Sequence, residues 1–566
     1  MYHLEKVPFS RYGSFLSIAV IDWASLGKGL YLRAHYEKTP SIFRIDPIRD
    51  GKVVGYEIEA SPNLLTLKVN GGGEVQIVLE GDESCLLRGK GVDLRLEMPK
   101  ERWVHTYAQP DGVWAFNMNP HGLQVALEPL DGKISMDAPW SKGKGFCYES
   151  EHMVATISPN KEGSFEAGID LFNTTWVKTQ RKSFDQVSRE AEAEWAEWMI
   201  GLPEVGHDDL EGRNLAAYVN WSAVVRPAGY IKRPTMYMSK MGMCNVYNWD
   251  NVFNAMAHCE HKPELAWDQL LVMSDYQDEF GKSATSLNRD SYRMNITNSP
   301  VHGWGLSYMW NKNPDMITPE RMSDAYSYLS NWIGWITEHR TWPGDRLPYY
   351  HHGFDCGWDN SSIFDEGVPL ITPDQSSYLI LLYETMEKLA ESLGKKKEAL
   401  AWNKRSKDLL KALIEDLWKE DHFVGILKPE NKVIETESLL ICMPMVLGKR
   451  LPESIQKSLV SRIKNHLTDH GLATENLSSP CYTEGAYWRG PIWAPSTMLI
   501  TSGLDEIGEV ELSKKIKRSF CEMCKKEGFY ENFDPVTGKG YYDPAYTWTS
   551  SVYMMFANEL LVGQGN

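Results

Sequence analysis

The sequence feature that most constrains the fold is a change in the spacing of apolar residues near residue 180. Before it, short runs alternate apolar and polar residues, which is typical of half-buried strands. Glycine, asparagine, aspartate and proline separate these runs, as in NGGGE and PDG. The runs are VVGYEIEA, LLTLKVN, EVQIVLEG, VDLRLEM and MVATISP. The pattern predicts an antiparallel β-sandwich domain over residues 1–182.

After this point the apolar spacing becomes helical. The segment SFDQVSREAEAEWAEWMIGLP starts at a Ser/Asp cap and ends at Gly-Leu-Pro, which predicts a linker helix within 183–206. Residues 207–566 carry many long helical patterns and few strands. The expected helices are 209–226, 264–280, 318–339, 374–393, 396–419, 434–446, 453–467, 491–503, 506–527 and 546–562. Because a helical solenoid would show a sequence repeat and none is evident, we expect an all-α toroid, in which helical hairpins close around a central axis.

Length, charge and cysteine content limit the class of protein. The 566 residues exceed what one ordinary core organises, so two domains are expected. The net charge of −17 argues against nucleic acid or an anionic membrane as a partner. The sequence contains neither a long apolar run nor a convincing signal peptide. The odd number of scattered cysteines favours a reducing compartment, so we expect a cytoplasmic location.

The loops between the predicted helices have an unusual composition. They are rich in Trp, Tyr, His, Asn and Asp: NVYNWDNVF, NSPVHGW, LPYYHHGFDCGWDNSS, CYTEGAYWRGPIW and YENFDPVTGKGYYDPAYTW. Aromatic rings offer flat faces for sugar C–H groups, and the polar side chains can bind hydroxyls. A small carbohydrate substrate is therefore expected. The alternative is that the aromatic residues form the core between helices.

Two carboxylates in these loops are candidates for acid–base chemistry. Asp359 lies in CGWDNSS and has no Lys or Arg within six residues on either side. Glu531 lies in EGFYENFDP, flanked by aromatic residues. Hydrolysis of a glycosidic bond needs one carboxyl group as an acid and another as a base or nucleophile. Apolar surroundings would raise the pKa of such carboxyl groups, although each could also be a structural carboxylate.

The chain from about residue 210 to its end resembles a clan of (α/α)6-barrel glycoside hydrolases. This clan contains family 63, with processing α-glucosidases, the family 37 trehalases, and the related mannosylglycerate and glucosylglycerate hydrolases. Four stretches carry the resemblance in the order of the family: VYNWDNVFNAMA, CGWDNSS, YWRGPIWAPSTMLI, and FYENFDPVTGKG followed by YTWTSSV. A weaker match is NSPVHGWGL.

The resemblance implies roles for individual residues. Asp359 corresponds to the general acid and Glu531 to the general base of an inverting mechanism. Such a mechanism places the two carboxyl groups roughly 6.5–9.5 Å apart. The implied sugar-binding residues are Trp249, Asp250, Trp304, Trp358, Tyr487, Trp488, Arg489 and Gly490, with His302 as a further pocket residue. Asp250 could instead be a buried N-cap, and Arg489 could form a structural salt bridge.

The sequence departs from the trehalase pattern in several places. Lys240 is the only basic residue shortly before the Trp-Asp pair, where trehalases have arginine, and their PGGRF and PGGGGEY stretches are missing. These differences argue against trehalose. Before Asp359, an Asp-Cys-Gly replaces the Glu-Ser-Gly of the family. The β domain has no sequence motif that resembles the family.

The main functional expectation is an inverting exo-acting α-glycosidase for a short α-linked oligosaccharide or glycoside, most simply an α-glucosidase. An alternative is a mannosyl- or glucosyl-glycerate hydrolase, which would need a positive charge from Arg289, Arg293 or Lys240. Alternatives of another kind are a non-catalytic carbohydrate-binding barrel protein and a phosphorylase. The presence of both Asp359 and Glu531 argues against these two.

Neither a metal nor a cofactor is expected. His351 and His352 are adjacent, point in different directions on most backbones, and have no completing carboxylate or cysteine pattern. The chain has no Walker A sequence, and SKGKGF at 141–146 lacks the strand–helix setting of a dinucleotide site. The sequence gives no expectation for the oligomeric state.

Overall fold

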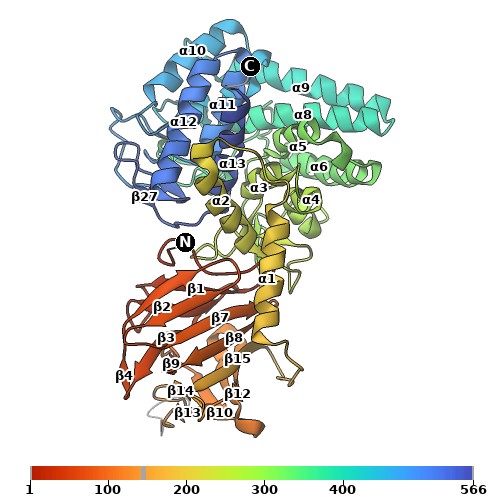
Figure 1. Ribbon diagram of the computed structural model, residues 1–566. Coiled ribbons are helices and arrows are strands. Elements are labelled where there is room, and N and C mark those ends of the chain that lie inside the picture. Colours follow the sequence, from red (N-terminus) through yellow and green to blue (C-terminus); the bar gives the residue numbers. More distant parts are fainter. Residues whose placement is uncertain (1–2, 142–147, 564–566) are drawn as a thin grey trace. The chain divides into compact units, whose positions relative to one another are not determined.

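The structure is a computed structural model that describes residues 3–141 and 148–563 (Figure 1). Most of the SKGKGF stretch lies outside these residues. The chain forms two compact units that are interleaved in sequence. The β unit contains Met1–Ile200, Tyr218–Arg226 and Ser239–Cys244, and the helical unit contains Gly201–Ala217, Pro227–Met238 and Asn245–Asn566. The predicted domain limits at 182 and 206 stay a prediction.

The β unit is built from two antiparallel sheets (Figure 1). The first has the order β1-β2-β3-β9-β14-β13, with β4 beside β3: β1 (Leu16–Ile21), β2 (Gly29–Ala34), β3 (Ser41–Arg49), β4 (Lys52–Val53), β9 (Asp93–Glu97), β13 (Lys133–Asp137) and β14 (Val154–Ser158). The second has the order β10-β11-β12-β15-β8-β7-β6-β5: β5 (Tyr56–Ala60), β6 (Leu65–Val69), β7 (Glu74–Glu80), β8 (Ser84–Lys90), β10 (Val104–Ala108), β11 (Trp114–Met118), β12 (Leu123–Asp131) and β15 (Ser164–Phe172).

The alternating sequence pattern explains how the sheets pack. In β9, Leu94 and Leu96 are fully buried, whereas the alternate residues Asp93, Arg95 and Glu97 are half-buried. The rings of Phe43 in β3 and Phe116 in β11 lie 4.9 Å apart, edge to face, and so join the first sheet to the second. The five runs that the sequence singled out coincide with β5, β6, β7, β9 and β14. The predicted antiparallel, sandwich-like N-terminal region is confirmed.

The predicted helix after residue 182 is α1 (Phe184–Met199). It begins where the Ser183 hydroxyl accepts a hydrogen bond from the Gln186 N–H, which satisfies one free donor of the first turn. Phe184 and Val187 then pack on Val78 and Leu86, so α1 covers part of the second sheet.

The helical unit is a ring of inner elements with further helices outside (Figure 1). The inner elements are α3 (Asp250–His258), α5 (His302–Lys312), α8 (Pro373–Ser392), the 3-10 helix η7 (Leu439–Arg450), α11 (Ala494–Ile507) and α13 (Thr547–Val562). Each contacts the next in this order, and α13 contacts α3, which closes the ring. The outer helices include α4 (Pro263–Leu271), α6 (Pro319–His339), α9 (Lys396–Leu417), α10 (Glu453–Asn465) and α12 (Val510–Glu527).

The seam that closes the ring is polar and buried. Asn254 in α3 donates to the Thr547 hydroxyl at 3.1 Å, and the Ser551 hydroxyl in α13 donates to the Asn254 side-chain oxygen at 2.8 Å. These contacts join residues nearly 300 positions apart, since the hydrogen bonds span 293 and 297 residues.

The structure differs from the helix predictions mainly at the inner ring. Helices α3 and α5 are not among the helices listed from the sequence, and the loop stretches NVYNWDNVF and NSPVHGW overlap their first turns. All nine residues of α3 are buried, including the polar Asn251, Asn254 and His258, so its burial does not follow its polar and apolar residues. The helix expected at 264–280 ends at Leu271 and continues as a 3-10 turn, and the one expected at 434–446 is η7.

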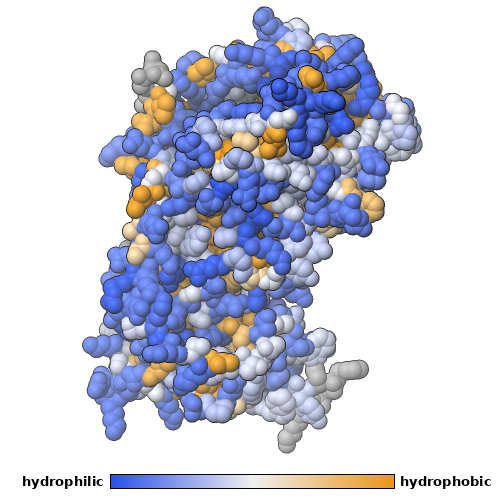
Figure 2. Space-filling model, turned by 90° about the vertical axis from the view of Figure 1, so that its right-hand side faces the viewer, coloured by the Kyte–Doolittle hydropathy of each residue, from blue (hydrophilic) through white to orange (hydrophobic). Residues whose placement is uncertain are grey.

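The molecular surface is largely hydrophilic on the face in Figure 2, where apolar residues are scattered. Within the described residues, no helix has the length and apolar character needed to cross a membrane.

Candidate active site

Three carboxyl groups of the helical unit influence one another. Asp250 is the first residue of α3, Asp359 follows the short helix α7 (Gly353–Cys356), and Glu531 precedes β26 (Asn532–Phe533). Asp250 and Glu531 are each only 4% exposed, and Asp359 is half-buried. Burial is the main cause that raises the pKa of Asp250 and of Glu531, and the negative charge of Asp359 raises both further. Loops far apart in the sequence therefore bring both predicted catalytic residues to one cluster.

The turn that carries Asp359 is held by two features of DCGWD. The buried Asp355 carboxylate accepts backbone N–H groups of Thr297 at 2.8 Å and His351 at 2.7 Å. Gly357 has a φ of +76°, and a Cβ there would lie 2.6 Å from the Trp249 ring, so only glycine fits. Asp355, where the family has glutamate, is thus an internal anchor for the turn.

Burial is the main cause that raises the pKa of Asp359, to about 6. A hydrogen bond from its own backbone N–H opposes this effect. A carboxyl group in this range can carry a proton near neutral pH, as a general acid must.

Glu531 is held by Tyr487. Burial raises the pKa of Glu531 to about 8, and the Tyr487 hydroxyl, which donates to Oε1 at 2.6 Å, acts in the opposite direction. Tyr487 has a φ of +60°, a strained conformation for a bulky residue. The Trp493 indole N–H donates to the Tyr487 carbonyl at 2.9 Å and helps to hold this conformation.

The two pKa values do not by themselves assign the roles. Glu531, at about 8, retains its proton to higher pH than Asp359, at about 6, whereas the resemblance makes Asp359 the acid. Either arrangement has one proton on the pair between these values, and the measured pKa values will belong to the pair. The roles must therefore be separated by variants, which are considered in the Discussion.

The pH dependence of activity follows from this pair. We expect kcat/KM to follow a bell-shaped profile with limbs near pH 6 and 8. Below the lower limb both carboxyl groups are protonated and no base remains; above the upper limb both are ionised and no acid remains. Initial rates at constant ionic strength from pH 4 to 10 check this. A profile that is flat across pH 5–9 would contradict the assignment of Asp359 and Glu531 as the acid–base pair.

Three of the predicted tryptophans meet in one buried aromatic cluster. The Trp488 ring lies 4.5 Å from Trp358 and 6.4 Å from Trp249. The cluster also contains Trp493, stacked on Trp488 at 4.0 Å, and Trp548, 5.6 Å from both Trp249 and Trp493. All five rings are only 1–3% exposed, so they form a buried aromatic support inside the helical unit. Direct stacking on a sugar stays a prediction.

The YWRG stretch is fixed to the loop after Asp359. Arg489 pairs with Asp365 and donates to the Asn360 carbonyl at 2.9 Å, while the Asn360 side chain accepts from the Trp488 N–H at 2.9 Å. The structural salt bridge considered for Arg489 is therefore present. Gly490 has a φ of +142°, and a Cβ there would lie 2.5 Å from the Tyr482 ring. Sugar contacts of Arg489 and Gly490 stay predictions.

Asp250 has a polar surrounding beyond the carboxyl groups. The N-cap position of α3 is Trp249, so Asp250 is the first residue of the helix, and the Tyr546 hydroxyl hydrogen-bonds to its carboxyl group. The charges of Asp250, Asp359 and Glu531 all raise the pKa of Tyr247, after burial as the largest cause, while Arg293 lowers it. Arg293 thus lies within electrostatic reach of the cluster. The sequence alone did not distinguish Arg293 from the other basic candidates, Arg289 and Lys240.

The structure gives the surroundings of the remaining predicted residues, for which a role in substrate binding stays a prediction. Trp304 lines a different cavity of the helical unit, and its ring lies 5.7 Å from Phe253 in the barrel core. His302 is 1% exposed and packs edge-on against Trp332 at 5.0 Å. Lys240 belongs to the β unit, where its buried ammonium donates to the carbonyls of Ser14 at 2.5 Å and Val224 at 3.1 Å.

Among residues 3–141 and 148–563, no group of three or more His, Cys, Asp or Glu side chains could hold a metal ion. His351 and His352 are both exposed.

Sequence comparison gives matches over the same part of the chain. A family model described as mannosylglycerate hydrolase MGH1-like glycoside hydrolase domain matches residues 243–549. A mannosylglycerate hydrolase of Rubrobacter radiotolerans is 20% identical over 401 residues, which is 54% of this chain and 89% of the relative. Mannosylglycerate hydrolase MGH2 of Selaginella moellendorffii is 21% identical over 390 residues, 54% of this chain and 78% of the relative.

Solved structures support the fold. The family 63 mannosylglycerate hydrolase of Thermus thermophilus, in complex with Tris and D-glycerate, aligns with a TM-score of 0.54 and 19% identity over 61% of this chain and 99% of that chain. A bacterial glucoamylase complexed with acarbose aligns with a TM-score of 0.66 and 10% identity over 99% of this chain and 94% of that chain. The second alignment includes the β unit, and the predicted (α/α)6-barrel fold class is confirmed.

Proposed function

Because the chain belongs to the mannosylglycerate hydrolase MGH1-like family of glycoside hydrolases, we propose that it hydrolyses an α-glycoside whose aglycone is a small carboxylate, with mannosylglycerate as the first candidate. The family and the relatives favour this alternative over the α-glucosidase that was the main expectation from sequence. An inverting mechanism, in which one carboxyl group donates a proton and the other activates water, fits such a family.

The observation that carries the choice of aglycone is the position of Arg293. A small sheet is formed by β18 (Val246–Tyr247), β19 (Ser286–Leu287) and β20 (Tyr292–Arg293). In its register Tyr247 pairs with Ser286, and Ser286 pairs with Arg293. Residues aligned across neighbouring strands project from the same face, so Arg293 and Tyr247 share a face of this sheet.

Arg293 is free to bind an anion. It is exposed, and no ion pair of its guanidinium is recorded within the described residues. After burial, the largest cause, the charges of Asp250, Arg293, Asp359 and Glu531 all act on the pKa of Tyr247, which supports a position of Arg293 near the carboxyl cluster. A guanidinium beside a cluster of carboxyl groups can hold the carboxylate of an aglycone while the acidic residues act on the neighbouring bond. Lys240 is excluded from this role because its ammonium is buried in the β unit.

In the proposed mechanism, one sugar unit binds above the aromatic support with its glycosidic oxygen toward Asp359. Asp359 transfers its proton to this oxygen, and the bond to the anomeric carbon breaks. Glu531 takes a proton from a water molecule, whose oxygen bonds to the opposite face of that carbon. The products are a β-configured sugar and the hydroxy acid, and the Tyr487 hydroxyl holds the Glu531 carboxylate toward its reacting position.

The proposal is tested with a panel of mannosylglycerate, glucosylglycerate, maltose, trehalose and methyl α-mannoside, followed by proton NMR. We expect a β-configured sugar to appear first from a glycerate-bearing compound. Replacing Arg293 with glutamine should raise KM for that compound about 10–100-fold, the effect of a lost charge-assisted hydrogen bond of about 1.5–3 kcal/mol.

The neutral methyl α-mannoside is the internal control, because its aglycone has no carboxylate for Arg293 to bind. An equal loss on both compounds would mean that Arg293 supports the fold rather than the aglycone. Faster turnover of maltose than of either glycerate compound would overturn the proposed substrate class and favour an α-glucosidase.

A further inference from the structure

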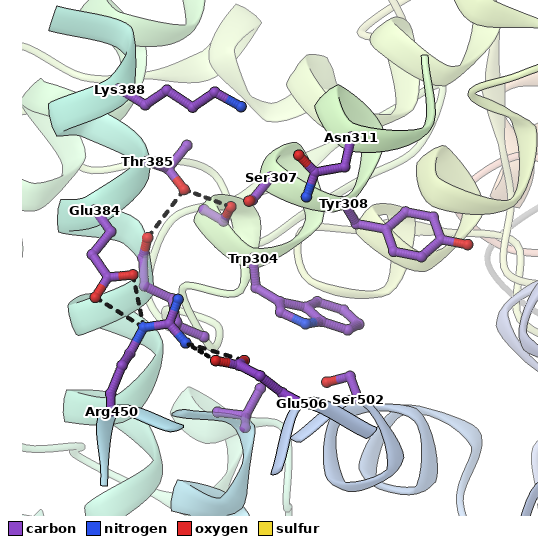
Figure 3. Close-up of a pocket in the computed structure, with 13 residues that line it drawn as sticks. Trp304, Ser307, Tyr308, Asn311, Glu384, Thr385, Lys388, Arg450, Ser502 and Glu506 are labelled. Atoms are coloured by element: carbon purple, nitrogen blue, oxygen red, sulfur yellow. Dashed lines mark hydrogen bonds and ion pairs between the residues drawn. The ribbon is translucent and has the colours of Figure 1, made fainter. Parts of the chain in front are cut away.

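A cavity of about 440 Å³ lies in the helical unit, with walls from α5, α8, η7 and α11 (Figure 3). Its lining includes Trp304, which the resemblance had placed in the sugar pocket, and side chains from the later turns of α8 and α11. A volume of this size is within the range of sites that bind small molecules.

The cavity lies away from the carboxyl cluster. Asp359 and Trp488 precede the first turns of α8 and α11, whereas Glu384 is well into α8 and Glu506 is near the end of α11. Each is eleven or twelve residues from the start of its helix. At 1.5 Å per residue they lie about 17 Å along the inner ring from the end where the catalytic loops begin. The cavity is therefore a separate feature of the barrel.

One wall of the cavity is a fixed ionic group. The Arg450 guanidinium donates to Glu384 Oε2 at 2.8 Å and to Glu506 Oε1 at 3.0 Å (Figure 3). Because one guanidinium pairs with two carboxylates, this group of three side chains has a net negative charge, and Arg450 is not available to bind an anionic ligand. Its carboxylate oxygens can still accept hydrogen bonds from hydroxyl groups.

The other wall presents donors without partners. The Lys388 ammonium lies 3.9 Å from the centre of the Trp310 ring, and in the part of the chain that the structure describes no carboxylate pairs with it. The side chains of Ser307 and Asn311 point toward the same space in Figure 3, and no hydrogen bond of either side chain is recorded within the described ranges. Burial lowers the pKa of Lys388, so its charge is only partly hydrated. Lys388 and Ser307 are half-buried and Asn311 is exposed, and a ligand in the cavity would complete their hydrogen bonds.

We propose that this cavity binds a small hydroxylated carboxylate, of the hydroxy-acid or sugar-acid class, as a site distinct from the catalytic one. Lys388 binds the carboxylate, Ser307 and Asn311 bind neighbouring hydroxyls, and the flat Trp304 ring contacts the C–H groups. The oxygens of Glu384 and Glu506 accept from further hydroxyls and repel a second negative charge, which disfavours sugar phosphates. A neutral sugar would leave Lys388 without a counter-charge. The proposal does not depend on the reaction catalysed at the carboxyl cluster.

Hydrogen–deuterium exchange with mass spectrometry tests the proposal because it locates binding in the chain. The probes are D-gluconate and D-glycerate, with glucose and glycerol as neutral controls at equal concentration. We expect the two acids to slow exchange in peptides that cover 302–312 and 381–392, and the neutral compounds to have no effect there. Protection confined to peptides around 355–365, 485–495 and 528–535, or equal protection by glucose, would overturn the proposal.

Two variants separate the site from general stability. Lys388→Met should weaken the affinity of the protein for gluconate, measured from the protection of the α5 and α8 peptides, by at least 10-fold. Lys397→Met, which changes an exposed lysine of α9, should leave this affinity unchanged. Asn311→Asp, at an exposed position, should weaken it similarly by charge repulsion and keeps the test valid if Lys388→Met fails to fold. If Asn311→Asp and a correctly folded Lys388→Met both bind gluconate with unchanged affinity, the site is excluded. Turnover of mannosylglycerate is measured separately, so a failure of the proposed function and a failure of this site give different results.

Discussion

Replacing Asp359 with asparagine should lower kcat on mannosylglycerate by about 10²–10⁴-fold, the contribution of a positioned general acid. The side chain keeps its size, so the turn held by Asp355 and Gly357 should not change. The loss should be much smaller on α-mannosyl fluoride, because fluoride leaves with little need for a proton. Initial rates of the wild-type and variant enzymes on both compounds give this ratio.

Glu531→Gln is the matched variant for the second role. If Glu531 is the base, the variant should lose activity on the glycoside and on the fluoride alike, since both need an activated water. The opposite result, with Glu531→Gln active on the fluoride and Asp359→Asn inactive on both, would exchange the roles. This exchange would agree with the higher pKa of Glu531, about 8, compared with about 6 for Asp359.

The same Glu531→Gln change should make the protein more stable at high pH. Burial raises the pKa of Glu531 from 4.5 to about 8. Below about pH 4.5, Glu531 is protonated in both the folded and the unfolded chain and has no effect on stability. Between that value and 8, the unfolded chain loses the proton while the folded chain retains it, so the wild-type free energy of unfolding falls as pH rises. Each pKa unit corresponds to about 1.4 kcal/mol, so the full effect is on the order of a few kcal/mol.

Thermal unfolding at pH 5, 7 and 9 measures this difference. We expect the Tm of Glu531→Gln minus that of the wild type to increase from pH 5 to pH 9. The change with pH is the readout, because any effect of the substitution that does not depend on pH adds the same amount to the Tm difference at each pH. Glu279→Gln, at an exposed glutamate, is the control and should show no such trend. A Tm difference that is constant with pH would mean that the Glu531 carboxyl group is not desolvated in the folded protein.

Much of the fold was predictable because local patterns agree with it. Strands such as β9 bury alternate residues, and outer helices such as α9 have one buried face, so their periods are visible in the sequence. The inner helices α3 and α5 do not show this agreement. The polar residues Asn251 and Asn254 of α3 are as buried as its apolar residues, and α5 contains two glycines, which disfavour a helix. Tertiary packing therefore decides the conformation of both segments.

The candidate site was predictable to the extent that short motifs carry it. Asp359, Glu531 and Asp250 lie in three separate motifs, and the barrel brings them together. The second tryptophan of YWRGPIW, Trp493, and the tryptophan of YTWTSSV, Trp548, were present in quoted motifs, but their place in the aromatic cluster depends on contacts between distant loops. Trp304 was assigned by its motif alone; it lines the cavity between α5, α8, η7 and α11, and its contact with a sugar stays a prediction.

The closed inner ring has a consequence for how activity arises during synthesis. The last inner helix, α13, completes the ring through its buried bonds to α3, and Glu531 lies just before α13 in the chain. Contacts between residues so far apart form late, because a long chain loses much conformational freedom when its ends meet. A ribosome-bound chain that has not yet released α13 therefore has no assembled site, and hydrolysis begins only once the whole barrel has folded.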